Sequence, residues 1–133
     1  MKISAQEEYG LRILIQLAKS PKGLAISEIA KREDLTIANT AKFCRLLRLS
    51  GYLKSTKGKD GGYHINIKPE DIHLDELMLS LDPPLYGEHF CDRFCNDTNI
   101  CTHATDCQVK NVWIKMQTAV QHTLGKLTLA DLL

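Results

Sequence analysis

Several features are absent from this sequence, and each absence excludes a class of protein. No apolar run approaches the ~18 residues needed to cross a bilayer, so we expect no contact with a membrane. The N-terminal segment MKISAQEEYG carries charges where a secretory signal peptide has an apolar stretch, and the protein is therefore expected in the cytoplasm. A phosphate-binding loop and a nucleophile paired with a base are also missing, which argues against an enzyme.

The 133-residue chain is 44% apolar and 25% charged, as expected for one folded domain, and its net charge of +1 predicts no partner. The two halves nevertheless differ in charge. Residues 1–69 contain 13 Lys and Arg against 6 Asp and Glu, a net charge of +7, whereas residues 70–133 contain 4 against 10, a net charge of −6. This asymmetry predicts that the first half binds a polyanion and that the second half has another role.

The first half is predicted to contain three helices followed by a β-hairpin. Ser4 and Glu7 form a capping box at the start of the first helix, which ends before Pro21–Gly23. Its expected buried stripe consists of Leu11, Leu14, Ile15 and Ala18. The other expected elements are helices at Ser27–Arg32 and Thr36–Ser50 and strands at Tyr52–Ser55 and Tyr63–Ile67.

The second half is predicted to be helical apart from one irregular segment. A helix is expected at Leu74–Leu81, a long helix at 108–125 and a short one at Leu127–Leu133, whereas residues 85–107 have no helical period. The fold class is therefore mainly α with a small β-hairpin wing, a winged helix-turn-helix plus a long dimerisation helix. We expect one compact domain with a DNA-binding region (1–69), a linker helix with a cysteine-rich loop (70–107), and the dimerisation and C-terminal helices (108–133).

The third helix is the expected recognition helix, because the second helix of a helix-turn-helix motif enters the major groove with its N-terminal residues. A helical wheel places Ile37, Thr40, Ala41, Cys44 and Leu47 on the core side. The opposite face and the hairpin tip supply the expected contacts to double-stranded DNA, namely Ala38, Asn39, Lys42, Arg45, Lys57, Lys59 and Gly61. An ordinary solvated helix face is the alternative interpretation, and the basic wing favours DNA binding over it.

Four of the five cysteines lie within seventeen residues of the irregular segment, at Cys91, Cys95, Cys101 and Cys107. Thiolates so closely spaced in a reducing compartment most often hold a soft metal or an iron–sulfur cluster. Zinc and four unrelated free cysteines are the alternatives, although a structural zinc site usually has two C-x2-C pairs. Cys44 is expected in the core.

The whole chain resembles the winged-helix regulators that include the iron–sulfur regulator IscR and the nitric-oxide-sensing repressor NsrR. The similar motifs are Met1-Lys2-Ile3-Ser4, Glu8-Tyr9-Gly10-Leu11-Arg12, the wing Lys57-Gly58-Lys59-Asp60-Gly61-Gly62-Tyr63 and the end Leu127-Thr128-Leu129-Ala130-Asp131-Leu132. Their C-x5-C-x5-C ligand pattern is matched by Cys95, Cys101 and Cys107.

The resemblance implies that these three cysteines bind an iron–sulfur cluster and that Glu8 of the partner chain supplies a fourth ligand. Lys110 stands where IscR has a ligating His, whereas Arg12 is as in NsrR. These differences favour [4Fe-4S] over [2Fe-2S]. Cys91 is an additional thiol and an alternative ligand.

The long helix is expected to form the interface of a homodimer that binds a palindromic operator. The predicted interface residues are Val109, Val112, Met116, Ala119, Val120 and Thr123. We therefore expect a transcriptional regulator, a repressor by resemblance, whose DNA binding is controlled by a cluster that senses nitric oxide, redox state or iron. A cluster-free regulator that responds to thiol state or a small molecule is the alternative, followed by a zinc or iron–sulfur enzyme.

Overall fold

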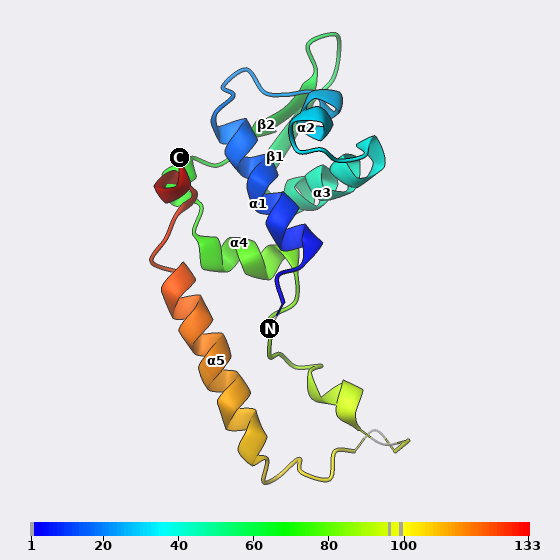
Figure 1. Ribbon diagram of the computed structural model, residues 1–133, viewed down its shortest axis with the longest axis vertical. Coiled ribbons are helices and arrows are strands. Elements are labelled where there is room, and N and C mark those ends of the chain that lie inside the picture. Colours follow the sequence, from blue (N-terminus) through cyan, green and yellow to red (C-terminus); the bar gives the residue numbers. More distant parts are fainter. Residues whose placement is uncertain (1, 96, 99) are drawn as a thin grey trace.

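A computed structural model describes residues 2–95, 97–98 and 100–133; Met1, Asn96 and Asn99 lie outside the described residues. The molecule is elongated, with a winged helix-turn-helix body at one end (Figure 1). The elements of this body are α1 (Ala5–Ala18), α2 (Ile26–Arg32), α3 (Ile37–Leu49), β1 (Leu53–Thr56) and β2 (Gly62–Ile65). The fold class predicted from the sequence is confirmed, because the chain is mainly helical with one antiparallel hairpin.

The second half extends away from this body. Its elements are the 3-10 helix η1 (Pro69–Asp71), α4 (Leu74–Leu81), η2 (Cys91–Phe94), α5 (Gln108–Leu124) and η3 (Leu129–Leu132). The short helix α4 crosses the lower end of α1, and α5 runs from there to the end of the molecule opposite the hairpin tip. The segment predicted to be irregular contains the 3-10 turn η2, which the lack of a 3.6-residue period did not indicate.

Both α1 and α3 begin at the caps that the sequence predicts. The hydroxyl of Ser4 accepts from the backbone N–H of Glu7, and the Glu7 carboxylate accepts from the N–H of Ser4, which completes a capping box. The Thr36 hydroxyl accepts from the N–H of Asn39 at 3.1 Å. These contacts span only three residues, which is why the local sequence suffices to predict them.

The buried face of α1 is shifted from the predicted stripe, of which only Leu14 is fully buried while the other three residues pack against the edge of the core. The buried residues of this helix are Gly10, Ile13, Leu14 and Leu17, whereas Leu11, Ile15 and Ala18 are only partly buried. Because α1 contacts α3, α4, β2 and η3, it carries apolar residues on several sides, and periodicity alone could not select the most buried one. A Cβ atom at Gly10 would lie 2.8 Å from the Leu81 side chain, so α4 packs directly on this face.

The predicted core side of α3 is correct for Thr40, Cys44 and Leu47, and wrong for Ile37. Ile37 is 56% exposed because the first turn of α3 extends beyond the helices against which the rest of α3 packs. Phe43 is buried instead and stacks on Tyr9, with the ring centroids 5.6 Å apart.

The wing is an antiparallel hairpin, and each strand begins and ends within one or two residues of the predicted positions. Leu53 pairs with Ile65 and Thr56 with Gly62. Tyr63 also exchanges two backbone hydrogen bonds with Leu24, so the hairpin is attached to the segment before α2. Because a Cβ atom at Gly62 would lie 2.5 Å from the Leu24 carbonyl oxygen, this attachment requires glycine.

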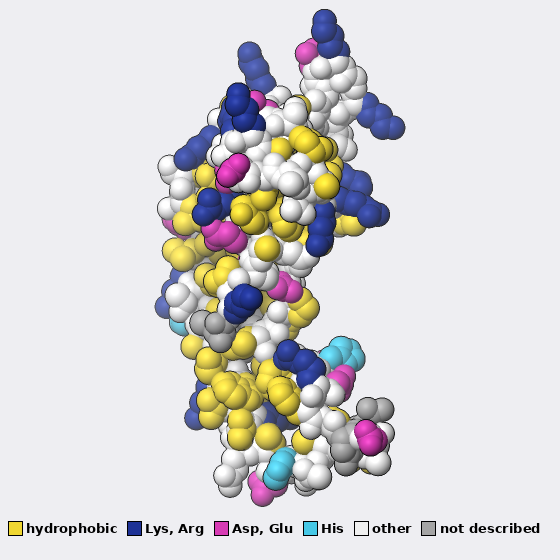
Figure 2. Space-filling view, turned by 45° about the vertical axis from the view of Figure 1, so that its right-hand side comes forward, with side chains coloured by type: hydrophobic (Ala, Val, Ile, Leu, Met, Phe, Trp, Pro, Cys, Tyr) yellow, Lys and Arg dark blue, Asp and Glu magenta, His cyan; other side chains and the backbone are white. Residues whose placement is uncertain are grey.

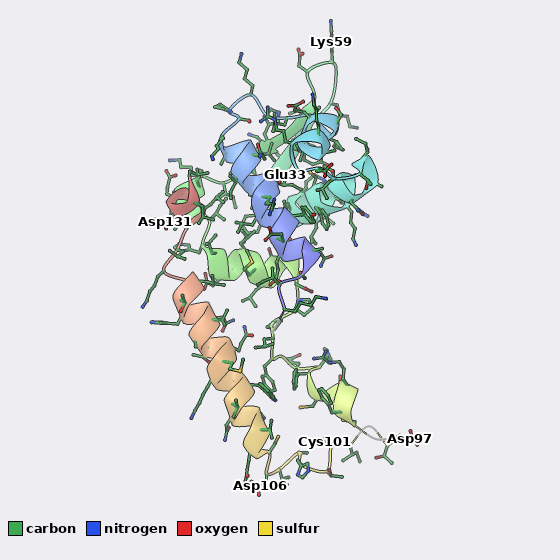
Figure 3. All side chains as sticks on the ribbon, in the orientation of Figure 1. Glu33, Lys59, Asp97, Cys101, Asp106 and Asp131 are labelled. Carbon is green, nitrogen blue, oxygen red and sulfur yellow. The ribbon has the colours of Figure 1, made fainter. Side chains whose placement is uncertain are left out.

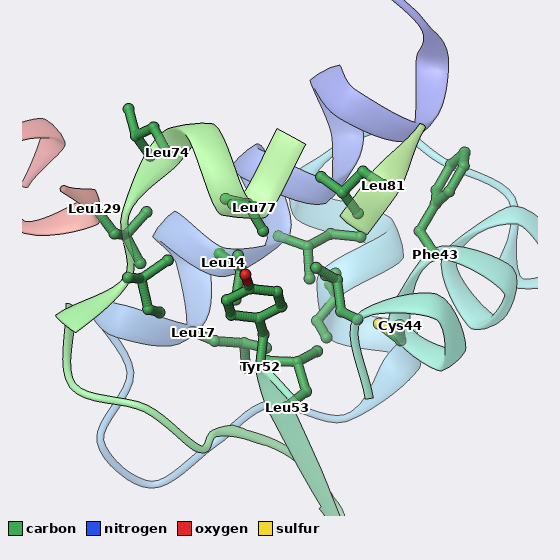
Figure 4. Packing of buried hydrophobic residues seen from close by; sticks show 14 residues of the cluster. Leu14, Leu17, Phe43, Cys44, Tyr52, Leu53, Leu74, Leu77, Leu81 and Leu129 are labelled. Carbon is green, nitrogen blue, oxygen red and sulfur yellow. The ribbon is translucent and has the colours of Figure 1, made fainter. Parts of the chain in front are cut away.

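One hydrophobic core joins the two halves of the chain. Leu14 and Leu17 of α1 meet Leu53 of β1, Leu77 of α4 and Leu129 of η3 (Figure 4). The C-terminal end returns to the start of α4, where the Leu129 N–H donates to the Ile72 carbonyl at 2.9 Å. The C-terminal end of α5 is thereby held against the body. No helix within the described residues is long and apolar enough to cross a membrane.

Candidate DNA-binding surface and cysteine segment

The start of α3 is exposed at residues 36–39, whereas Thr40 is buried. Thr36, Ile37, Ala38 and Asn39 are all exposed, and Lys42 and Arg45 continue the exposed face one and two turns further on. The Asn39 amide and the two cations are therefore available to a ligand, as the sequence predicts for base edges and phosphates. Their role in DNA contact stays a prediction.

The basic surface is larger than the sequence analysis predicted. Arg48 and Lys54 are also exposed, and neither forms an ion pair within the described residues. Lys and Arg side chains gather around the upper part of the molecule, where α3 and the hairpin lie, whereas the lower part is richer in apolar side chains (Figure 2). The three-residue spacing from Arg45 to Arg48 was the signal that could have revealed Arg48.

The hairpin tip carries both predicted wing cations. Lys57 and Lys59 are exposed, and Lys59 lies at the extreme upper end of the molecule (Figure 3). Gly58 has φ +108°, a conformation that favours glycine. A Cβ atom at Gly61 would lie 2.5 Å from the Thr56 carbonyl oxygen, so Gly61 has a structural role in closing the turn. Its predicted contact with DNA is untested.

The cysteine segment lies at the opposite end of the molecule, where Cys101 is labelled in Figure 3. Cys91, Cys95, Cys101 and Cys107 are free and partly exposed. The Cys95 thiol donates to the Cys91 carbonyl at 3.1 Å, and the Cys107 sulfur caps α5 by accepting from the Lys110 N–H at 3.3 Å. Burial, together with the neighbouring Cys101 thiol and Asp92, raises the pKa of Cys95.

These thiols form a suitable donor set for an iron–sulfur cluster. Thiolates are the usual protein ligands of such clusters, and four partly exposed thiols lie in one segment. Within the described part of the chain, however, no three metal-ligating side chains converge on one point. The ligand set Cys95, Cys101 and Cys107 therefore stays a prediction.

An aromatic cluster connects the cysteine segment to α5. Phe90 contacts Tyr86, Phe94 and Trp113, with ring centroids 5.1, 5.4 and 6.5 Å apart. The Arg93 guanidinium lies 5.1 Å from the centroid of Phe90. This cluster positions the turn that contains Cys91 next to α5. The sequence analysis missed it, because the contact between Phe90 and Trp113 crosses more than twenty residues.

Glu8 does not lie on the buried side of α1. Its side chain is 49% exposed and lies opposite the buried face of the helix. The carboxylate accepts from Arg12 Nε at 2.6 Å. In turn, the Arg12 guanidinium lies 3.8 Å from Glu33, whose side chain is almost fully buried. Glu8 is therefore turned toward solvent or another chain.

The long helix α5 has no buried residue among its seventeen, all of which the structure describes. The predicted interface residues Val109, Val112, Ala119 and Thr123 are exposed, whereas Met116 and Val120 are partly buried. An adjoining side of α5, which shares Val120 with the predicted interface, lines a groove of about 370 Å³ together with the N-terminal part of α1 and with α4; Glu8 and Leu11 are also among the lining residues.

A helix-turn-helix followed by a basic two-stranded wing defines a class of DNA-binding proteins, the winged helix-turn-helix regulators. Within this class the chain belongs to the Rrf2 family, because residues 3–133 match the family described as "Rrf2: Iron-dependent Transcriptional regulator". The resemblance to IscR and NsrR regulators is thereby confirmed. The protein is a DNA-binding transcriptional regulator, and its relatives are regulators rather than enzymes.

Individual relatives cover almost the whole chain. Protein rrf2 of Nitratidesulfovibrio vulgaris (strain Hildenborough) is 31% identical over 136 residues, which cover 100% of this chain and 87% of that protein. The regulator NsrR of Bacillus subtilis (strain 168) is 28% identical over 134 residues, which cover 99% of this chain and 90% of that protein. The structure of CymR, described as the global cysteine regulator of B. subtilis, has a TM-score of 0.77 at 27% identity, covering 99% of this chain and 95% of that one.

Proposed function

We propose that this protein is a homodimeric transcriptional regulator whose affinity for a palindromic operator is controlled by an iron–sulfur cluster. The observation that carries the proposal is the group of four free, partly exposed thiols in one segment beside α5, in a chain of an iron-dependent regulator family. When bound, the cluster would supply a centre that reacts with nitric oxide or oxygen.

Cys95, Cys101 and Cys107 are the proposed thiolate ligands, and the fourth ligand comes from Glu8 of a second chain or from Cys91 of the same chain. The exposure of Glu8 supports the first alternative, since a carboxylate that faces away from its own core is available to a partner. The position of Cys91, whose carbonyl accepts from the Cys95 thiol, supports the second.

The contacts of Arg12 would connect a cluster bound by Glu8 to the helix-turn-helix. Arg12 interacts with Glu8 on one side and with Glu33, the residue that ends α2, on the other. Glu33 also accepts from Gln16 Nε2 at 2.7 Å. If Glu8 binds the cluster, Arg12 loses one of its two acidic partners and is drawn toward Glu33, which lies in the turn between α2 and α3. Cluster loss would reverse this change.

The exposed stripe on α5 supports homodimerisation. Val109 and Val112 are 55% and 51% exposed, so the helix presents large apolar side chains that the single chain does not cover. A twofold axis along this face would place one winged body on either side of it, as a palindromic site requires.

The cluster is tested by purifying the protein without oxygen. We expect a brown protein with visible absorption and with bound iron and sulfide in the wild type. The visible absorption and the bound iron and sulfide should be lost in Cys101→Ala and in Cys107→Ala. They should be retained in Cys44→Ala, because the Cys44 thiol lies in the core. Circular dichroism checks that each variant is folded.

Operator binding is then compared before and after treatment with nitric oxide. The wild type should change its affinity, whereas Cys101→Ala should not respond. A colourless wild-type protein that contains no iron would contradict the proposal.

A regulator that responds through its thiols without a cluster is the second candidate. The similarity to CymR favours it, because that protein is described as a cysteine regulator. In this case the anaerobic protein should be colourless, and thiol oxidation alone should change its affinity for DNA. The same four cysteines would then be the reactive groups.

A further inference from the structure

Ile37 is a large apolar residue at the first position of the recognition helix, and it is more than half exposed. The fold does not require an apolar side chain there. Thr36 caps the helix through its hydroxyl, and the core side of α3 is completed by other residues. Single exposed apolar residues are common on protein surfaces, so the location of Ile37 must carry the argument.

That location is the part of the fold that reaches base edges. In helix-turn-helix proteins the N-terminal residues of the recognition helix contact the bases, while neighbouring cations contact phosphates. Ile37 and Asn39 both project from the exposed first turn of α3, and the exposed Lys42 and Arg45 follow on the next two turns. Arg48 lies three turns from Ile37 on the same side of the helix.

An isoleucine side chain cannot form hydrogen bonds, so only an apolar group can be its partner on a base edge. In the major groove that group is the 5-methyl of thymine, which no other DNA base carries. We propose that Ile37 is a specificity-determining residue that contacts a thymine methyl group in each half-site of the operator. The inference depends on the DNA-binding function and deepens it.

The chemistry of Asn39 agrees with this assignment. A side-chain amide pairs with the N6 and N7 atoms of adenine, so Asn39 would also read an A·T base pair, from a position about 200° around the helix from Ile37. We therefore expect conserved A·T base pairs where the half-site faces the start of α3, with a thymine at the one that Ile37 contacts.

The experiment begins with selection of binding sites from random duplexes by the wild-type protein, in both the anaerobic and the cluster-free form. Each thymine of the selected site is then replaced by deoxyuridine, which removes only the methyl group. At one symmetric thymine the wild type should lose about fourfold in affinity per half-site, the factor expected when one methyl group is no longer buried. Ile37→Ala should bind thymine and deoxyuridine sites equally.

Leu49→Ala is the matched control, because Leu49 is 65% exposed at the other end of the same helix. This variant should keep the wild-type preference for thymine. If Ile37→Ala is as sensitive as the wild type to deoxyuridine at every position, the inference is wrong while the DNA-binding function stands. If the wild type selects no sequence in either form, the function and the inference fail together.

Discussion

At the residue scale, the reactivity of a cysteine thiol depends on its burial. Cys44 lies fully buried among the core residues of α3, as Figure 4 shows, whereas the four cysteines of the C-terminal half are partly exposed. Burial raises the pKa of Cys44 to about 12, because a thiolate would be poorly solvated in the core. Only the thiolate reacts with electrophiles, so Cys44 should be chemically inert.

We predict that iodoacetamide at pH 8 modifies four cysteines of the native, cluster-free protein and spares Cys44. With a pKa of about 12, the thiolate fraction at this pH is on the order of 10⁻⁴. Mass spectrometry counts the modified residues, and the unfolded protein should show five. Modification of native Cys44 at the rate of the other four would contradict its burial.

Two single substitutions distinguish the candidates for the fourth ligand. If Glu8 is a ligand, Glu8→Gln should alter the visible spectrum and shorten the lifetime of the cluster, while Cys91→Ser leaves both unchanged. The thermal midpoint of the cluster-free protein should not move in Glu8→Gln, because the ion pair with Arg12 is exposed and such pairs contribute little to stability. The reverse pattern would assign the ligand to Cys91, and no effect in either variant would exclude both.

At the element scale, the wing is an antiparallel hairpin that carries exposed cations at its tip. Its glycines allow a tight turn and a close approach to Leu24, and the lysine side chains extend from the tip into solvent. Such side chains contact phosphates as point charges and carry no sequence information. The wing should therefore contribute affinity, and the first turn of α3 should contribute specificity.

We predict that the double variant Lys57→Gln, Lys59→Gln weakens binding to the operator and to random DNA by the same factor. The slope of log K against log salt should become less steep by about 0.9 for each phosphate contact that is lost. Fluorescence anisotropy over a range of salt concentrations measures both quantities. Lys126→Gln, an exposed lysine beyond α5, is the control and should leave the slope unchanged. A loss restricted to the operator would show that the wing reads sequence.

Asn39 is expected to behave in the opposite way to the wing lysines. Asn39→Ala should weaken binding to the operator by ~1–3 kcal/mol for each lost base contact and leave binding to random DNA almost unchanged. Competition between the two DNAs measures the difference. Equal losses on both would contradict a base-reading role.

At the scale of the whole molecule, α5 connects the winged body to the cysteine segment. Its C-terminal end is held by the hydrogen bonds between the last residues and the start of α4, and its N-terminal end carries the cysteine segment. The helix lies against its own chain through one side only, and the other side carries the exposed apolar stripe.

We predict that Val112→Asp converts the proposed homodimer to a monomer and abolishes tight binding to a palindromic operator. The substitution is harmless in a single chain, where Val112 is exposed, but it buries a charge in an interface formed by this stripe. Ile114→Asp is the control, because Ile114 is also exposed and lies nearly half a turn away. Sedimentation velocity gives the oligomeric state. A dimeric Val112→Asp variant would place the interface elsewhere.

The sequence by itself determined the features that depend on neighbouring residues. The caps at Ser4 and Thr36 follow from contacts across three residues, and the turn of the wing follows from the glycines between two short strands. The spacing of Cys95, Cys101 and Cys107 is likewise a property of the chain, and with the other motifs it was enough to indicate the family.

The tertiary structure alone decided which of several possible faces is buried. Helix α1 is apolar on more than one side, so only packing against α3 and α4 selected Ile13 and Leu17 over Leu11 and Ile15. Ile37 has the right period for the core and is nevertheless exposed, because no element of the described chain covers its side chain. Hydrophobic periodicity describes one helix in isolation. The burial of each residue depends on which other elements of the fold pack against that side of the helix.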